Sequence, residues 1–417
     1  MVAQVFIFRI IKHDNHLLFP GLVGGWIVEH LLMRGEDPAA IRVLDLNEPE
    51  TRKLLESGGS FVKTDVTNKE SIARAFEQAW PNHVRTLPLT VFHTVAYINP
   101  SDRNAAFLLP YVSVNIEGTR NILNAAQKAG ADCFVATSSA SVGLRIPSYF
   151  PWPWQRWPKD IYQFLPNADP TSPDLPLGSY GTCYAWSKAQ AEKLVRLANN
   201  DEFRTGVIRP GHGIYGHGVE NPNSLTWQYL SRGGSPTWLY NVVAHFVSAE
   251  NVSIGHLAFE DALLKKDSRV GGNAYCVLDP NPPIIYADLY RALLILAHPA
   301  TPIKFPKVPH IVMLFMAYGL EQYHLLRNKF LPSLPALSKD LTFLQPAVFN
   351  VSALHIVYTD TAAQNDIGYR APISTLEGFA LAMREWNEKV EAKAKSKSDA
   401  VSDMHEDRVV PQPPMIR

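Results

Sequence analysis

A tyrosine and a lysine stand four residues apart in the segment Tyr184-Ala-Trp-Ser-Lys188. On a helix, this spacing places the two side chains on one face. An ammonium beside a phenol stabilises the phenolate and lowers the pKa of the tyrosine from its ordinary value of about 10. The pair could therefore supply a general base near neutral pH. The same spacing is common on ordinary helix faces, so its meaning depends on the neighbouring segments.

A serine-rich strand end, Thr137-Ser138-Ser139-Ala140-Ser141, comes one element before this pair. This context, together with the dinucleotide-type α/β pattern before it, makes the Tyr184/Lys188 pair more informative than an isolated spacing.

Glycines mark a second site near the start of the chain. Gly21, Gly24 and Gly25 lie where a strand should turn into a helix. A dinucleotide site needs glycines there, because the backbone must approach the pyrophosphate at the helix N-terminus. Asp45 ends an apolar strand about 20 residues later, where an acid binds the adenosine ribose hydroxyls. An acid here disfavours a 2′-phosphate, so the pattern predicts NAD.

Alternating strands and helices must position these residues. Apolar runs typical of buried strands lie at 5–11, 41–45, 61–65, 89–96, 133–137 and 205–209. Helical patterns lie at 26–33, 71–80, 113–129, 184–199, 285–297 and 374–386. This order predicts an α/β fold with a doubly wound parallel sheet of the Rossmann type and a smaller C-terminal substrate lobe.

We expect three regions along the chain. A dinucleotide-binding Rossmann domain covers residues 1–240, a substrate-binding lobe covers 241–388, and a disordered charged tail covers 389–417. A Pro/Trp-rich loop at 142–183 interrupts the first region; its prolines exclude a helix or a central strand. Long loops of this kind are often lids, and these aromatics could line an apolar ligand. A flap that packs on its own domain is an equal alternative.

Composition restricts the partners. Lys plus Arg and Asp plus Glu number 39 each, so net charge gives no case for nucleic acid. Cys133, Cys183 and Cys276 have neither disulfide nor metal spacing, which suits a reducing compartment, and we expect no metal site. No apolar run reaches the roughly 18 residues of a spanning helix. The nearest, 311–326, suits a core helix best, and contact with a membrane surface stays open.

The ordered set of motifs resembles the extended short-chain dehydrogenases of the 3β-hydroxysteroid dehydrogenase/isomerase family, particularly the sterol-4α-carboxylate 3-dehydrogenases (decarboxylating). The resemblance runs from about Gly21 to about Asn387. Its carriers are Gly21-Leu-Val-Gly24, Ile41-Arg-Val-Leu-Asp-Leu46, Asp65-Val66, Phe92-His-Thr-Val-Ala96, Val114-Asn-Ile-Glu-Gly-Thr119, Thr137-Ser-Ser-Ala-Ser141, the Tyr184/Lys188 pair and Ile208-Arg-Pro-Gly211.

The resemblance implies a role for each matching residue. Tyr184 would be the catalytic base, and Lys188 its activator and a ribose ligand. Ser139 would hold the substrate hydroxyl, with Ser138 as the close alternative. Ser139 could instead only cap its strand, but this strand precedes the Tyr184 helix in the order that the chemistry requires. Asn115 would help a water relay behind Lys188, unless it is only a polar residue at a helix start. The implied cofactor site comprises Gly21, Gly24, Asp45, Asp65 and Val66 (flanking the adenine), Val95 and Ala96 (lining the path to the nicotinamide), Tyr184, Lys188 and Pro210.

The implied activity is NAD-dependent oxidation of a 3β-hydroxyl on a sterol or triterpenoid-like substrate, with decarboxylation where the adjacent carbon carries a carboxylate. The resemblance also implies a location in the cytoplasm or on the cytoplasmic face of the endoplasmic reticulum membrane. Whether the protein forms a homodimer stays open. One alternative is a ketoreductase or sugar-nucleotide epimerase with the same Ser/Tyr/Lys set. The Trp-rich loop argues against a sugar nucleotide, and Asp45 argues against NADPH. The other is a cofactor-poor binding protein without catalysis.

The sequence departs from the family at the phosphate turn. The expected G-x-x-G-x-x-G would place a glycine at Leu18, where a side chain should crowd the pyrophosphate. Pro20 also removes a backbone N–H. Residues 5–11 could serve as the first strand, which makes 12–17 an extra loop. Our hypothesis is that residues 1 to about 20 derive from an untrimmed intron or alternative first exon, and a transcript encoding the same start would reject it.

Overall fold

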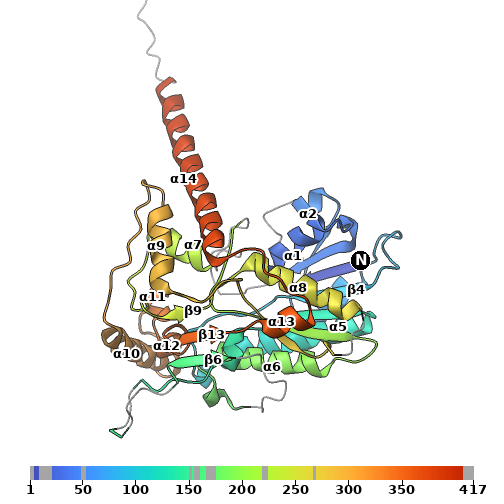
Figure 1. The fold of residues 1–417 in the computed structure, drawn as a ribbon, viewed down its shortest axis with the longest axis horizontal. Helices are drawn as coiled ribbons and strands as arrows, with labels where there is room; N and C mark the ends of the chain where they lie inside the picture. The colour runs from blue at the N-terminus through green and yellow to red at the C-terminus, as the bar shows by residue number, and fades with distance from the viewer. Residues whose placement is uncertain are drawn as a thin grey trace, which may run out of the picture.

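A seven-stranded, entirely parallel sheet lies at the centre of the computed structural model (Figure 1). The structure describes residues 4–8, 21–47, 53–149, 153–154, 160–165, 175–217, 224–265 and 269–406. The strand order is β11-β7-β5-β4-β1-β2-β3. The strands are β1 (Gln4–Phe8), β2 (Ile41–Asp45), β3 (Ser60–Lys63), β4 (Leu89–His93), β5 (Cys133–Thr137), β7 (Arg204–Pro210) and β11 (Ala274–Val277). This doubly wound order confirms the predicted fold class.

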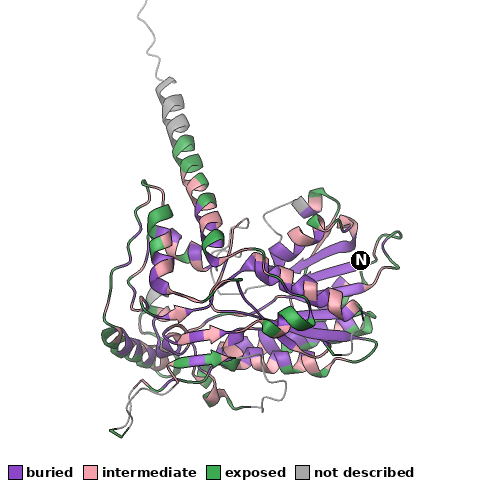
Figure 2. Cartoon of the chain, in the orientation of Figure 1, coloured by how far each residue is buried: buried purple, intermediate pink, exposed green. Residues whose placement is uncertain are grey.

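Helices cover both faces of the sheet, since its strands are apolar on both sides (Figure 2). One face carries α1 (Leu22–Met33), α8 (Ala249–Leu264) and the short α13 (Thr361–Asp366). The other carries α3 (Lys69–Glu77), α5 (Thr119–Lys128) and α6 (Cys183–Leu197). Short segments join them: α2 (Lys53–Glu56), α4 (Leu108–Tyr111), the π-helical η3 (Val112–Gly118), and the 3-10 turns η1 (Pro38–Ala40), η2 (Ala105–Phe107), η4 (Ala140–Gly143) and η5 (Leu177–Ser179).

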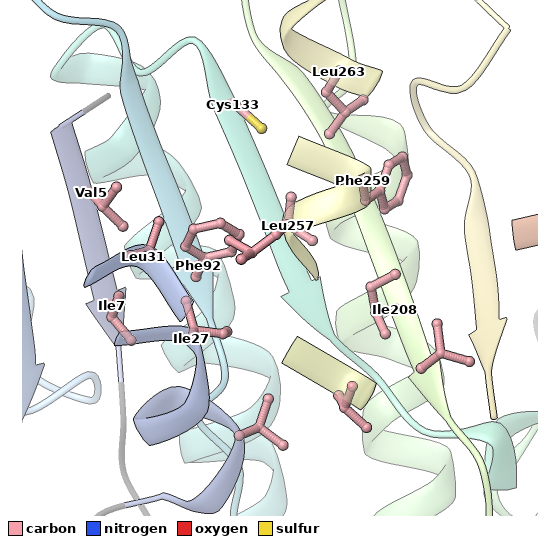
Figure 3. Close-up of a cluster of buried hydrophobic side chains, with 14 of the residues drawn as sticks. Val5, Ile7, Ile27, Leu31, Phe92, Cys133, Ile208, Leu257, Phe259 and Leu263 are labelled. Atoms are coloured by element: carbon pink, nitrogen blue, oxygen red, sulfur yellow. The ribbon is translucent and has the colours of Figure 1, made fainter. Parts of the chain in front are cut away.

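The first strand forms at the centre of the sheet. β1 pairs with β2 and β4, with Val5 opposite Ile41 and Thr90. Val5 and Ile7 lie in the cluster that α1 closes with Ile27 and Leu31 (Figure 3). The strand expected at 5–11 is therefore present in the first part of that range. Leu18 and Pro20 lie outside the described residues.

The sheet extends into the region that we assigned to the substrate lobe. β11 pairs with β7, and α8 packs against α1 on the same face. Residues 249–277 thus complete the Rossmann sheet. An amphipathic helix followed by a strand has the same pattern in either domain, so its neighbours in space decide the assignment.

The remaining elements form a lobe with its own apolar core. Its helices are α7 (Leu225–Ser231), α9 (Tyr286–Leu296), α10 (His310–Lys329), α11 (Lys339–Phe343) and α12 (Pro346–Ser352). Three small sheets join β8 (Ile214–Tyr215) to β10 (Val247–Ser248), β9 (Val243–Ala244) to β12 (Ile284–Ile285), and β6 (Tyr162–Leu165) to β13 (His355–Tyr358). β6 corrects our assignment of 142–183 as loop throughout. It is proline-free, and the buried Gln163 side chain bonds the Arg145 backbone.

The last helix, α14, spans Thr375–Glu406 and projects from the lobe (Figure 1). It begins at the predicted capping box, where the backbone N–H of Ser374 donates to Glu377 over 2.9 Å. We expected disorder from residue 389, but the helix continues to Glu406. Lys389 donates to Glu385 one turn earlier over 2.6 Å, and pairs of this kind support a solvent-facing helix. Residues 407–417 lie outside the described part.

Within the described residues, no helix is both long enough and apolar enough to span a membrane. The three cysteines are buried free thiols.

Candidate active site

The carboxyl ends of the parallel strands bring most predicted site residues to one edge of the sheet. Asp45 ends β2, Val95 and Ala96 follow β4, Ser139 follows β5 and Pro210 ends β7. Ligands of doubly wound sheets bind at this edge. The topology therefore unites residues that are far apart in the sequence.

Tyr184 lies in the first turn of α6, beside Ser139. Thr182 caps this helix by accepting a hydrogen bond from the N–H of Ala185 over 3.0 Å. Ser139 lies close enough to the Tyr184 phenol for its hydroxyl to lower the pKa of that phenol, and its Oγ lies 2.8 Å from the hydroxyl of Ser141. Ser139 also caps η4, because its Oγ accepts from the N–H of Ser141 over 3.2 Å. The capping alternative and the pairing with Tyr184 are thus both true of Ser139.

Ser138 has a different environment. It is buried, and its hydroxyl donates to Glu192 over 2.8 Å, away from the Tyr184 phenol. Two bonds to Arg209 hold the same carboxylate. Of the two serines that we kept open, Ser139 is the one that contacts the tyrosine.

The electrostatics of Tyr184 correct the sequence expectation. Burial raises the pKa of the Tyr184 phenol to about 12, and the Ser139 hydrogen bond offsets this only in part. We expected a lowered pKa from the neighbouring ammonium. Burial of the phenol is the largest cause of the shift, and Lys188 is not among the groups that change this pKa.

Lys188 is buried on α6, one turn after Tyr184. Its Nζ donates to the backbone carbonyl of Thr137 over 2.7 Å. Burial lowers the pKa of Lys188 to about 7, against the opposing influence of Glu192. A small cavity beneath it is lined by Lys188, Glu192, His93, Thr119, Thr137, Ser138, Ala136, Ala191, Val195 and Val207.

Asn115 lies in the π-helical turn η3, a distortion that is frequent at functional sites. Its Oδ1 accepts from the N–H of Tyr97 over 2.7 Å, and its Nδ2 donates to the Tyr97 carbonyl and, over 2.8 Å, to Ser187. Ser187 in turn donates to the carbonyl of Tyr184. Asn115 therefore ties the segment after β4 to the tyrosine helix, while its role in a water relay stays a proposal.

Two histidines near Lys188 escaped the sequence reasoning. His93 ends β4 and His256 lies on α8, and both are buried. Their charges interact with Lys188. The sequence does show each histidine as a polar residue inside an otherwise apolar run. This pattern more often indicates a hydrogen-bonded histidine of the core than a residue of the active site.

The residues at the nucleotide end of the edge fit a dinucleotide. Gly21 is the N-cap of α1, no side chain caps this helix, and its first turn carries no acid. Such a terminus presents backbone N–H groups to a pyrophosphate. Gly24 lies within the first turn, and the Asp45 carboxylate, at the end of β2, accepts from the N–H of Asn47. The backbone N–H groups at the start of α1 would thus face the pyrophosphate of NAD, and the Asp45 carboxylate would face its adenosine ribose.

The other predicted cofactor residues support the same edge. The carboxylate of Asp65 accepts from Thr67, and the carbonyl of Val66 accepts from Asn121. Val66 also packs so closely on Gly118 that a Cβ there would lie 2.9 Å from its side chain. Val95, Ala96 and Pro210 are buried at the ends of their strands. Their contacts with a cofactor remain proposals.

Comparison with known families covers most of the chain. The model of the NAD dependent epimerase/dehydratase family matches residues 19–229. The model of the 3-beta hydroxysteroid dehydrogenase/isomerase family matches residues 164–300. The second match includes the Tyr184/Lys188 pair, α8 and β11.

Curated relatives share moderate identity. The decarboxylating sterol-4-alpha-carboxylate 3-dehydrogenase of Schizosaccharomyces pombe is 29% identical over 296 residues, which are 69% of this chain and 76% of that protein. The mouse 3 beta-hydroxysteroid dehydrogenase type 7 is 26% identical over 397 residues, covering 90% and 95%.

Solved structures share the fold. The UDP-glucose 4-epimerase of Thermus thermophilus, in complex with NAD, aligns with a TM-score of 0.56 at 18% identity and covers 91% of this chain and 98% of that one. The Thermotoga maritima UDP-glucose 4-epimerase aligns with a TM-score of 0.57 at 14% identity, covering 93% and 99%.

Proposed function

We propose that this chain, which belongs to the NAD dependent epimerase/dehydratase family, oxidises a 3β-hydroxyl group on a sterol or triterpenoid-like ring system. It is an NAD-dependent oxidoreductase that acts on CH–OH groups, as the motifs predicted. The observation that carries the oxidation chemistry is the position of Ser139 beside the Tyr184 phenol at the carboxyl end of β5, and the sterol substrate is supported by the match to the 3-beta hydroxysteroid dehydrogenase/isomerase family.

The Ser139 and Tyr184 hydroxyls form a pair that can hold one substrate oxygen between them. In the proposed reaction, Ser139 donates to that oxygen and Tyr184 removes its proton. Lys188, one turn along α6, stabilises the phenolate that Tyr184 must become. When bound, NAD would accept the hydride.

The sterol preference is supported by the curated relatives and by the match to the 3-beta hydroxysteroid dehydrogenase/isomerase family. A carboxylate on the carbon next to the oxidised one would make the product a β-keto acid. Such an acid loses carbon dioxide readily, because the new carbonyl accepts the electron pair of the broken bond. Decarboxylation would then need no further residue beyond those that oxidise the alcohol.

The direct test is turnover by the purified full chain. We expect NADH to form with 3β-hydroxysterols, with carbon dioxide released only from the 4α-carboxylated ones, and at least tenfold less turnover with NADP because of Asp45. A UDP-sugar serves as the competing substrate. Epimerisation of that sugar, without sterol oxidation, would reject the sterol proposal.

We also propose that the lobe touches a membrane surface through α10. Ile311, Val312, Phe315 and Met316 expose 44–64% of their surface on one face of this helix. Between residues 301 and 338 there are four Lys or Arg residues and one acid, Glu321. Arg103 neutralises that acid over 2.7 Å. An apolar face with a basic surround suits an anionic lipid interface.

The Phe315→Asp variant tests this contact. We expect about tenfold weaker binding to vesicles of phosphatidylcholine with phosphatidylserine, because the variant removes an exposed phenyl group that the lipid would bury and adds a negative charge. Leu197→Asp, at a similarly exposed leucine on α6, is the matched control. Equal loss in both variants, or no binding by the parent chain, would contradict the proposal. Co-sedimentation measures it.

A further inference from the structure

His256 connects α8 to the strand end that holds Lys188. The side chain is fully buried, and its Nδ1 lies 2.9 Å from the carbonyl of Val252, one turn earlier on α8. A carbonyl only accepts, so Nδ1 carries the proton. The Nε2 is therefore an acceptor, and the hydroxyl of Thr137, 2.7 Å away, must donate to it.

Thr137 links the fixed His256 imidazole to Lys188. It is the last residue of β5, and its backbone carbonyl accepts from Lys188 Nζ over 2.7 Å. Its hydroxyl and its carbonyl are thus both engaged. An edge contact with Phe92, with ring centroids 6.2 Å apart, also holds the imidazole. The result is a continuous path from α8 through Thr137 to the ammonium.

Lys188, whose pKa is lowered to about 7 by burial, lies beside two imidazoles that burial keeps neutral. His93 is the second of these; its Nε2 lies 2.8 Å from Thr119 Oγ1, which gives its own proton to the Asn115 carbonyl, so Nε2 donates. Burial and the Lys188 charge lower the pKa of His93 to about 3 and that of His256 to about 4. The other titratable groups nearby are Tyr184, Glu192 and Arg209, and the last two pair with each other.

We propose that His256 is a positioning residue for the reaction: through the Thr137 hydroxyl, it fixes the carbonyl that orients the Lys188 ammonium. Its catalytic consequence rests on the proposed function, whereas the hydrogen-bond path can be tested without turnover.

The path itself is tested by nitrogen NMR of the protein with ¹⁵N-labelled histidines. We expect a neutral His256 with the proton on Nδ1 throughout about pH 5 to 8, where an unperturbed histidine titrates. The His256→Gln variant assigns the signal, and the exposed His83 is the control. A proton on Nε2, or titration of His256 within this range, would overturn the proposal even if no substrate were known.

The consequence is tested by variants of both partners. His256→Leu and Thr137→Val should each lower kcat about tenfold, leave KM within about twofold, and raise the pH of half-maximal kcat by about one unit, since one pKa unit corresponds to a tenfold change. His256→Gln and Thr137→Ser keep the acceptor and the hydroxyl and should recover most of kcat. His83→Leu should behave as the parent.

A double variant shows whether His256 and Thr137 act through one hydrogen-bond path or affect kcat independently. The double variant His256→Leu/Thr137→Val should lose no more than either single variant, because residues in one hydrogen-bond network are not additive. A product of the two losses, or an unchanged pH profile in both single variants, would show that His256 acts only by packing. Thr137→Val keeps the test valid if His256→Leu folds poorly.

Discussion

Replacing Tyr184 by phenylalanine is expected to lower kcat by about a hundred- to ten-thousandfold, the range that a general base contributes. NAD affinity should stay within about threefold. The change removes one hydroxyl from a half-buried ring and leaves the helix, its Thr182 cap and the ring packing in place. Steady-state NADH formation and a thermal-shift titration with NAD measure the two quantities.

Two comparisons make the Tyr184→Phe result specific. Ser139→Ala removes the hydroxyl that contacts the phenol but leaves the base, so its loss should be smaller, about ten- to a hundredfold. Tyr162→Phe alters a tyrosine that is 77% exposed on β6 and should change nothing. Turnover retained by Tyr184→Phe would refute the assignment of the base, and loss of NAD binding would indicate a damaged fold.

The parts that the sequence predicted well are those set by local spacing. β2 and β5 have the predicted bounds, and the capping box begins α14 at Thr375. Asp45 and Ser139 reach the same sheet edge because each directly follows or ends an apolar strand. Parallel pairing then fixes where these ends must meet.

The features of the site that the sequence could not predict depend on residues that are close in space but distant in the chain. The pKa of Tyr184 rises because the folded chain buries it, whereas the four-residue spacing to Lys188 predicted only the local charge effect. The choice of Ser139 over Ser138 depends on Glu192, which is 54 residues away from Ser138 in the sequence. His256 lies 119 residues from Thr137, beyond any local pattern.

The buried ion pair between Glu192 and Arg209 is expected to have a large effect on the free energy of unfolding. Glu192 on α6 and Arg209 on β7 expose 3% and 9% of their side chains, and Arg209 Nε donates to Glu192 over 2.9 Å. The pair joins the tyrosine helix to the sheet, and it also holds the Ser138 hydroxyl. Without Arg209, the buried Glu192 carboxylate keeps only the longer ion pair with Arg196, at 3.5 Å, and breaking a buried pair costs about 3–5 kcal/mol.

We therefore expect Arg209→Met to lower the free energy of unfolding in urea by about 3–5 kcal/mol. Arg120→Met is the matched control, because the Arg120–Glu117 pair is about half exposed and such pairs contribute about 1 kcal/mol or less. The double variant Arg209→Met/Glu192→Leu should regain much of the loss, since no charge is then left buried without a partner. A loss in Arg209→Met no larger than in Arg120→Met would mean that solvent reaches Glu192. A double variant as unstable as the single one would instead assign the cost to lost packing between α6 and β7.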